Sequence, residues 1–216
     1  MSVWCFHSFK QKWDVVTRLT QPRRHHGMCV FGNSFYLIGG FGRYRTILKS
    51  FEQYDVKTDE WTTLPPLLTR VTSPGVTVHE QKIYVVQTSI QCYDVRTKMW
   101  TVIELCPSLC AEFKHLLCGD TLTVGGSIYV CNAYGPHFTI LDTTADDFNA
   151  GDVYFFPNAH GKAVVMNEKL YRDGGVTCNK LECYDPAKKK FEIVGTRDHY
   201  IQRNKLLVLP YYPNFR

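Results

Sequence analysis

Among the side chains that could do chemistry, the nine cysteines of the chain are the first to consider. Cys106, Cys110 and Cys118 lie in one region, and Cys178 and Cys183 lie in another. No two of them form a C-x-x-C pair, and their spacings do not match those of structural zinc sites. We therefore predict that they pack as small hydrophobic residues. The alternative is a redox-sensing thiol, for which Cys178 in its glycine-rich loop is the candidate.

The sequence also lacks the residue patterns of acid–base catalysis and of dinucleotide binding. Asp146 and Asp147 are adjacent, so in an extended chain they point to opposite faces and cannot act as a catalytic pair. The histidines are scattered, and His25-His26 precede a predicted strand, where we expect a structural role. Gly39-Gly40 and Gly125-Gly126 lack the G-x-G-x-x-G spacing of a dinucleotide site. We predict that the chain is not an enzyme, has no catalytic residue, and binds no metal and no cofactor.

A repeated pattern organises most of the sequence. An acid, usually preceded by tyrosine, is followed six residues later by a large aromatic residue. The four sets are Tyr54-Asp55 with Trp61, Tyr93-Asp94 with Trp100, Leu141-Asp142 with Phe148, and Tyr184-Asp185 with Phe191. Near the start of the chain, Phe6-His7 and Trp13 keep the same offset. Aspartate commonly starts a turn by bonding the backbone two residues on, so each set predicts a hairpin.

Upstream of each set lie two further apolar runs, the second of which contains a tyrosine and ends at a break. The break is Gly39-Gly40 or Gly174-Gly175 in the first and fourth units, and Gln87-Thr88 or Asn132-Ala133 in the others. We attribute the glycines to crowding where strand ends meet. Each unit thus reads as four short antiparallel strands. So small a sheet cannot bury its faces alone, and radial stacking of such sheets gives a β-propeller.

These residues resemble the kelch repeat, and the match is nearly complete over Phe35–Gly40, Tyr54-Asp55 and Trp61. Arg24–Gly27 and Leu64–Leu67 also resemble blade boundaries of the kelch-like (BTB–kelch) family. The resemblance covers nearly the whole chain. It implies an all-β fold, a kelch-type β-propeller of four-stranded antiparallel blades. It covers a C-terminal kelch portion without the BTB and BACK helical domains that precede the repeats in that family.

We expect a single kelch-repeat domain over residues 1–216, with about five blade equivalents. A partial blade is predicted at 1–21, repeats at about 22–68, 69–107, 108–158 and 159–197, and a closing strand at about 204–210. If the closing strand pairs with the N-terminal strands, the ring closes. The alternative is a partial propeller, because the family usually closes with six blades.

In a propeller, loops at one end of the blades share a face, and loops on a rigid scaffold commonly carry binding residues. Arginine and tyrosine often anchor protein interfaces, and arginine can bind a carboxylate through two bonds, so an acidic peptide is a suitable ligand. The predicted partner-binding residues are Arg43, Tyr44, Arg45, Arg70, Gln87, Ser89, Asn132, Tyr134 and Asn179. Arg43-Tyr44-Arg45 lies in the longest of these loops.

The resemblance implies a protein-binding module, of the substrate-recognition type used by adaptors of cullin–RING ubiquitin ligases. The cullin would be reached only through the missing BTB region. The alternatives are an actin- or cytoskeleton-associated scaffold and a truncated isoform without independent activity. A net charge of +5, not gathered on one face, argues against nucleic acid as a partner. We expect no membrane partner, because no apolar run is long enough to span one. Nine cysteines without a signal peptide predict the cytosol or the nucleus.

Overall fold

The computed structural model describes residues 2–103, 118–132, 137–142, 150–157, 161–174 and 178–196. Within these ranges the regular structure is β-strand, apart from one short 3-10 turn, η1 (Arg43–Arg45). The predicted all-β class is therefore confirmed. No helix in the described part of the chain has the length and apolar character to cross a membrane.

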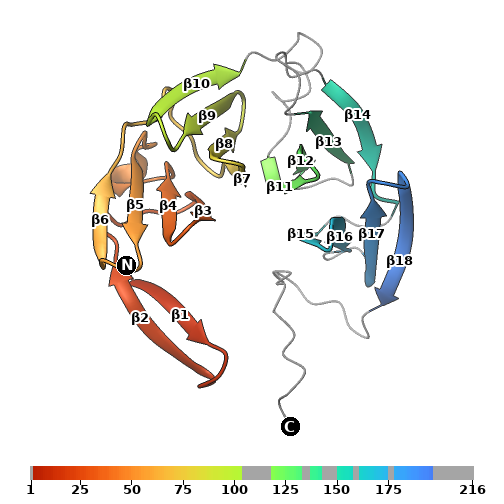
Figure 1. Ribbon diagram of the computed structural model, residues 1–216, viewed down its shortest axis with the longest axis horizontal. Helices are drawn as coiled ribbons and strands as arrows, with labels where there is room; N and C mark the ends of the chain where they lie inside the picture. Colours follow the sequence, from red (N-terminus) through yellow and green to blue (C-terminus); the bar gives the residue numbers. More distant parts are fainter. Residues whose placement is uncertain are drawn as a thin grey trace. The chain divides into compact units, whose positions relative to one another are not determined.

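The strands form one two-stranded ribbon and four four-stranded sheets (Figure 1). The ribbon consists of β1 (Ser2–His7) and β2 (Lys12–Arg18). The next two sheets are β3 (Gly27–Phe31), β4 (Ser34–Ile38), β5 (Phe51–Asp55), β6 (Glu60–Thr63), and β7 (Gly75–His79), β8 (Lys82–Val86), β9 (Ile90–Asp94), β10 (Met99–Ile103). The last two are β11 (Cys118–Val124), β12 (Ser127–Asn132), β13 (His137–Asp142), β14 (Ala150–Phe155), and β15 (Ala163–Met166), β16 (Lys169–Asp173), β17 (Lys180–Asp185), β18 (Lys190–Thr196).

Within each sheet the strands pair in chain order. The pairs of β3–β6, β11–β14 and β15–β18 are antiparallel. Each sheet lies within one of the four predicted repeats, which is the arrangement expected of kelch-type blades. The predicted repeat limits and closure of a ring remain predictions, and the predicted closing strand lies outside the described residues.

The chain divides into two compact units. Unit 1 comprises Met1–Val85 and Gln91–Val102, and unit 2 comprises Val86–Ile90 and Ile103–Arg216. Unit 1 holds β1 to β6 and most of β7–β10, and unit 2 holds β11–β14 and β15–β18. Each unit is described by itself below.

The repeated aspartates end the third strand of a sheet and start the hairpin to the fourth. In the three aspartates whose side chains are described, one carboxylate oxygen accepts two backbone N–H bonds. Asp55 accepts from Lys57 and Thr58, Asp94 from Arg96 and Thr97, and Asp185 from Ala187 and Lys188, at 2.7–3.3 Å. For Asp142 the structure describes only the backbone, at the end of β13. Where its side chain is seen, the predicted aspartate thus forms the turn as expected.

The repeated aromatic residues face each other across that hairpin. Tyr54 is the register partner of Trp61, and Tyr184 that of Phe191. Ring centroids are 5.1 Å apart for Tyr54–Trp61, 5.0 Å for Tyr93–Trp100, 4.8 Å for Tyr184–Phe191 and 5.2 Å for Phe6–Trp13. Phe148 lies outside the described residues. The fixed offset in the sequence therefore encodes a cross-strand aromatic pair.

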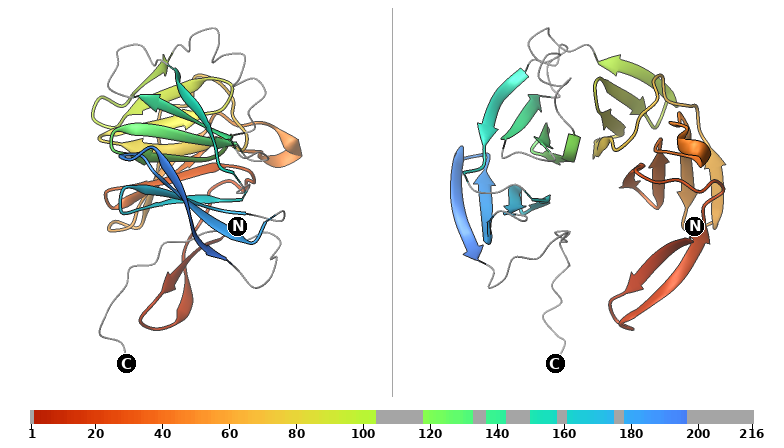
Figure 2. Two further views of the ribbon diagram at one scale, coloured as in Figure 1. Left: turned by 90° about the vertical axis from the view of Figure 1, so that its right-hand side faces the viewer. Right: turned by 180° about the vertical axis from the view of Figure 1, so that it is seen from behind.

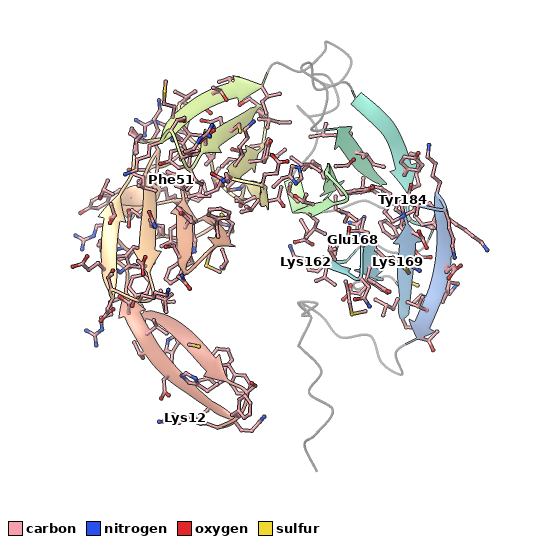
Figure 3. All side chains as sticks on the ribbon, in the orientation of Figure 1. Lys12, Phe51, Lys162, Glu168, Lys169 and Tyr184 are labelled. Carbon is pink, nitrogen blue, oxygen red and sulfur yellow. The ribbon has the colours of Figure 1, made fainter. Side chains whose placement is uncertain are left out.

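In both units the aromatic pair packs against the preceding sheet. In unit 1 the ring of Phe51 on β5 lies 4.7 Å from Tyr93 and 5.0 Å from Trp100. In unit 2 the ring of Phe138 on β13 lies 5.2 Å from Tyr184. Figure 3 labels Phe51 and Tyr184. We call the face of a sheet that carries its aromatic pair the near face. Each core thus joins the near face of one sheet to the sheet before it.

Gly39 and Gly40 follow β4 with positive φ angles of 57° and 90°. A Cβ on Gly39 would lie 2.7 Å from the Val71 carbonyl oxygen, and one on Gly40 would lie 2.7 Å from that of Arg24. Gly174, after β16, is packed against Cys178 in the same way, and Gly175 lies outside the described residues. The crowding predicted here is present. Around Gly39 and Gly40 it comes from the segments that lead into β3 and β7 rather than from strand ends.

Candidate functional site

Three segments of unit 1 meet at one end of its sheets and form what we call the loop face, made of residues 19–26, 39–50 and 64–74. Arg24 and Phe41 exchange backbone hydrogen bonds of 2.8 and 3.0 Å. The Leu67 N–H donates to the Lys49 carbonyl at 2.9 Å, and the Gly40 N–H donates to the Val71 carbonyl at 2.9 Å. The loop face is therefore a connected surface rather than three independent loops.

The tip of the loop face is the turn η1, which projects from the sheet β3–β6 (Figure 2). The Gly42 N–H donates to the Thr46 carbonyl at 2.9 Å and the Thr46 N–H to the Arg43 carbonyl at 3.1 Å, which closes the turn. Tyr44 and Arg45 have left-handed φ angles of 56° and 59°. For residues other than glycine this costs about 1–2 kcal/mol each. Tyr44 is 98% exposed, so the turn presents its side chain to solvent.

The two ends of unit 1 differ in their charged side chains. The segments of the loop face contain no aspartate or glutamate. Their basic residues are Arg23, Arg24, Arg43, Arg45, Lys49 and Arg70. The turns at the other end of the same sheets carry both signs of charge: the acids Asp55, Asp59, Glu60, Glu80 and Asp94, and the basic residues Lys57, Lys82, Arg96 and Lys98. The loop face is thus positively charged and suited to an anionic ligand.

Some cations of the loop face are engaged within the protein. The Lys49 Nζ donates to the Leu68 carbonyl at 2.5 Å, and the Arg70 Nη1 donates to the Ile47 carbonyl at 2.6 Å. The guanidinium of Arg24 lies 5.7 Å from the centre of the Phe41 ring. These contacts hold the loops against each other.

By contrast, the exposed side chains of Arg43 and Arg45 make no hydrogen bond or ion pair with any described residue. They are therefore the cations of the loop face that are available to a ligand.

A buried polar anchor holds the loop face to the sheet. The Arg23 side chain is fully buried, forms an ion pair with Glu52, and donates from Nη1 to Ser50 Oγ at 2.8 Å. Thr20 Oγ1 donates to the second carboxylate oxygen of Glu52 at 2.8 Å. The segment 19–26 is thereby fixed to β5.

Gln91 is the counterpart of Glu52 in the next sheet. Its side-chain oxygen accepts from the Thr69 N–H at 3.0 Å, and its Nε2 donates to Thr69 Oγ1 at 2.8 Å. These anchors were not predicted from the sequence. The sequence feature that could have identified them is a polar residue three positions before each repeated aspartate. These four residues are Glu52, Gln91, Thr139 and Glu182, and all of them are buried.

The structure brings together four of the nine predicted partner-binding residues, namely Arg43, Tyr44, Arg45 and Arg70. Gln87 and Ser89 lie in the turn between β8 and β9, where the Gln87 N–H donates to the Ser89 carbonyl at 3.1 Å. They and the half-buried Asn179 belong to unit 2. The backbone of Asn132 ends β12, whereas its side chain and Tyr134 lie outside the description. A role for these five residues remains a prediction.

Burial makes the core thiols poor nucleophiles. It raises the pKa of Cys29 and of Cys131 to about 12, and it also raises the pKa of Cys92 and Cys183. A thiol with such a pKa stays protonated at neutral pH. Cys178 is only half-buried, and its Sγ accepts the Lys180 N–H at 3.4 Å.

Cys106 and Cys110 lie outside the described residues, and for Cys118 only the backbone is described. The described ranges contain no group of three His, Cys, Asp or Glu side chains that could hold a metal ion. A redox role for Cys178 remains a prediction.

Comparison with known proteins shows which proteins this chain is similar to. The Kelch motif matches residues 22–68, which contain β3–β6 and most of the loop face. Kelch-like protein 38 of Rattus norvegicus is 25% identical over 232 aligned residues, which cover 99% of this chain and 39% of that protein. The chain thus contains a Kelch motif and is similar to kelch-like proteins over nearly its whole length.

Other kelch-like proteins show the same similarity. Kelch-like protein 25 of Xenopus tropicalis is 23% identical and covers 89% of this chain and 36% of its own length. Kelch-like protein 6 of Homo sapiens is 37% identical over 84 residues, which are 39% of this chain and 13% of that protein. The chain spans about two fifths of the length of the first relatives it matches.

Proposed function

We propose that this chain binds another protein through its loop face. The observation that carries the proposal is the pair of exposed arginines at the tip of the loop face. Arg43 and Arg45 make no hydrogen bond or ion pair with any described residue, and the three segments of the loop face contain no Asp or Glu. An anionic partner could therefore pair with these two arginines without displacing an acidic side chain of the chain itself.

An acidic peptide segment fits this surface best. A guanidinium can hold a carboxylate through two parallel hydrogen bonds. Arg43 and Arg45 flank the exposed Tyr44, and arginine and tyrosine are the residue types that most often dominate binding energy at protein interfaces. Because η1 is closed by its own backbone bonds, little loop entropy is lost on binding.

The finer role that we propose is substrate recognition in a cullin–RING ubiquitin ligase adaptor. It rests on the similarity to kelch-like proteins and requires a longer protein with a BTB region. In this role the chain has no catalytic activity of its own, and it acts in the cytosol or the nucleus.

Affinity capture with a triple variant tests the proposal. Arg43→Ala, Tyr44→Ala and Arg45→Ala together should abolish recovery of the proteins that the unmodified chain captures from a cell lysate. The matched control replaces the exposed Lys57 and Lys98, at the other end of unit 1, by alanine. If the triple variant, shown to be folded, captures the same proteins, the loop face is not the binding surface. Co-sedimentation of the unmodified chain with actin filaments would instead favour the cytoskeletal alternative.

A further inference from the structure

Two of the basic side chains of the loop face form a reciprocal pair of bonds at the base of the loop that carries η1. The Lys49 Nζ donates to the Leu68 carbonyl at 2.5 Å, and the Arg70 Nη1 donates to the Ile47 carbonyl at 2.6 Å. Each cation thus ends on the backbone of the segment opposite its own. We call this contact, between residues 47–49 and 67–71, the base junction.

Backbone bonds run along the base junction as well. The Leu67 N–H donates to the Lys49 carbonyl at 2.9 Å, and the Val71 N–H donates to the Leu48 carbonyl at 3.4 Å. Leu67 and Val71 are each 2% exposed, and both belong to the hydrophobic core of unit 1. One side of the base junction is therefore fixed to the core, and it holds the other side in place.

The turn η1 has a support on each side and none at its tip. Before the turn, Phe41 exchanges backbone bonds with Arg24, and after the turn comes the base junction. Backbone bonds of Gly42 and Thr46 close the turn itself. Among the described residues, the Arg43 side chain has no hydrogen-bond or ion-pair partner, and neither has its companion two positions on. The direction in which η1 projects is thus set at its base.

The basic residues of the loop face accordingly differ in what their donors do. The four that are engaged within the protein are Arg23, Arg24, Lys49 and Arg70. Lys49 and Arg70 remain charged, yet each directs a donor at a backbone carbonyl of the chain itself. Arg70, predicted from the sequence to bind the partner, therefore has the contacts of a residue that holds a loop.

We propose that Arg70 and Lys49 are positioning residues, which hold η1 in its binding orientation, while Arg43 and Arg45 alone pair with the ligand. The proposal rests on the function proposed above and deepens it, because it limits the recognised element to carboxylates within reach of a single turn. Without the base junction, both arginines would still be present but free to reorient. Binding would then have to order them, which lowers affinity.

Hydrogen exchange of the free chain tests positioning without any ligand, because the Gly42 and Thr46 amides both close η1. Arg70→Ala and Lys49→Ala should each speed exchange of these amides by at least about threefold, since exchange reports local opening. Arg43→Ala should leave it unchanged. Arg70→Lys should restore slow exchange, because Lys49 shows that an ammonium group can bond a carbonyl at this junction.

Binding of a labelled hexaglutamate peptide, followed by fluorescence anisotropy, tests the link to recognition. Arg70→Ala should weaken binding about three- to tenfold. Arg70→Lys should bind like the unmodified chain. Lys57→Ala, which removes one charge at the other end of unit 1, is the matched control and should also bind like it.

A double-variant comparison separates positioning from direct contact. Residues that act through one another have effects that do not add. In a chain that already carries Arg43→Ala, the further change Arg70→Ala should therefore weaken hexaglutamate binding by a smaller factor than it does in the unmodified chain.

Two results would each overturn the proposal. One is unchanged exchange of the Gly42 and Thr46 amides in Arg70→Ala. The other is an equal fold-loss of peptide binding with and without Arg43, which would mean that Arg70 contacts the ligand itself. Failure of the proposed function looks different: the unmodified chain would not bind hexaglutamate, whereas exchange in η1 would still respond to Arg70→Ala.

Discussion

Glu52 and Gln91 occupy the same position in successive sheets, and each holds the chain segment that leads into its own sheet. Glu52 binds Thr20 and Arg23 before β3, and Gln91 binds Thr69 before β7. A buried polar group is costly unless it is paired, so each anchor specifies one position for its segment. The loop face thereby owes its geometry to residues that never reach its surface.

Arg23→Ala should destabilise unit 1 by about 3–5 kcal/mol, since it leaves the carboxylate of Glu52 buried without its cation. Urea unfolding followed by tryptophan fluorescence measures this, because the tryptophans Trp4, Trp13, Trp61 and Trp100 all lie in unit 1. The exposed neighbour Arg24→Ala is the control. If Arg23→Ala lowers the free energy of unfolding no more than Arg24→Ala does, the ion pair does not contribute to the stability of unit 1.

Gly40→Ala should cost at least about 2 kcal/mol more than Gly32→Ala. Both glycines have positive φ angles, 90° and 61°. A Cβ at Gly40 would meet the backbone of Arg24 and His26, whereas one at Gly32 meets nothing within 4 Å. Both variants place a side chain at a positive φ angle, so they share the backbone strain. The difference between their free energies of unfolding, measured in the same assay, therefore reports the close approach at Gly40. An equal decrease in the free energy of unfolding for both variants would mean that the segment before β3 does not constrain Gly40.

The hairpin aspartates should make unit 1 less stable in acid. Backbone N–H groups of Thr97 and Arg96 hold the pKa of Asp94 below its ordinary value of 3.8. The unfolded chain then binds more protons than the folded chain, so the stabilisation is present above pH 4 and is lost as pH falls through the folded pKa.

Asp94→Asn keeps an oxygen that can accept both bonds but cannot titrate. The variant should therefore show a shallower fall in unfolding free energy between pH 5 and pH 3 than the unmodified chain, measured by urea unfolding at each pH. An unchanged slope would assign the acid sensitivity to other carboxylates.

The sequence predicted the features that depend on residues close together in the chain. The turn at Asp55 and the pair Tyr54–Trp61 are both set by one hairpin, so a fixed offset was enough to find them. The anchor of Arg23 on Glu52 joins residues 29 positions apart. It could be found only by comparing polar residues at equal places in the repeats.

The candidate site was predicted in part for the same reason. Arg43, Tyr44 and Arg45 are exposed because they form the tip of a loop between two identifiable strands. That Arg70 bonds the Ile47 carbonyl, and so ties two loops together, depends on how separate loops meet.

The most direct test of loop-face binding is quantitative recovery of partner proteins by two charge-reversed variants of equal net charge. One carries Arg43→Glu and Arg45→Glu, and the other carries Lys57→Glu and Lys98→Glu at the opposite end of unit 1. Binding of an acidic segment at the loop face predicts that the first variant loses about tenfold or more of the proteins captured by the unmodified chain, while the second retains them. Equal recovery by both variants, or equal loss, would contradict it.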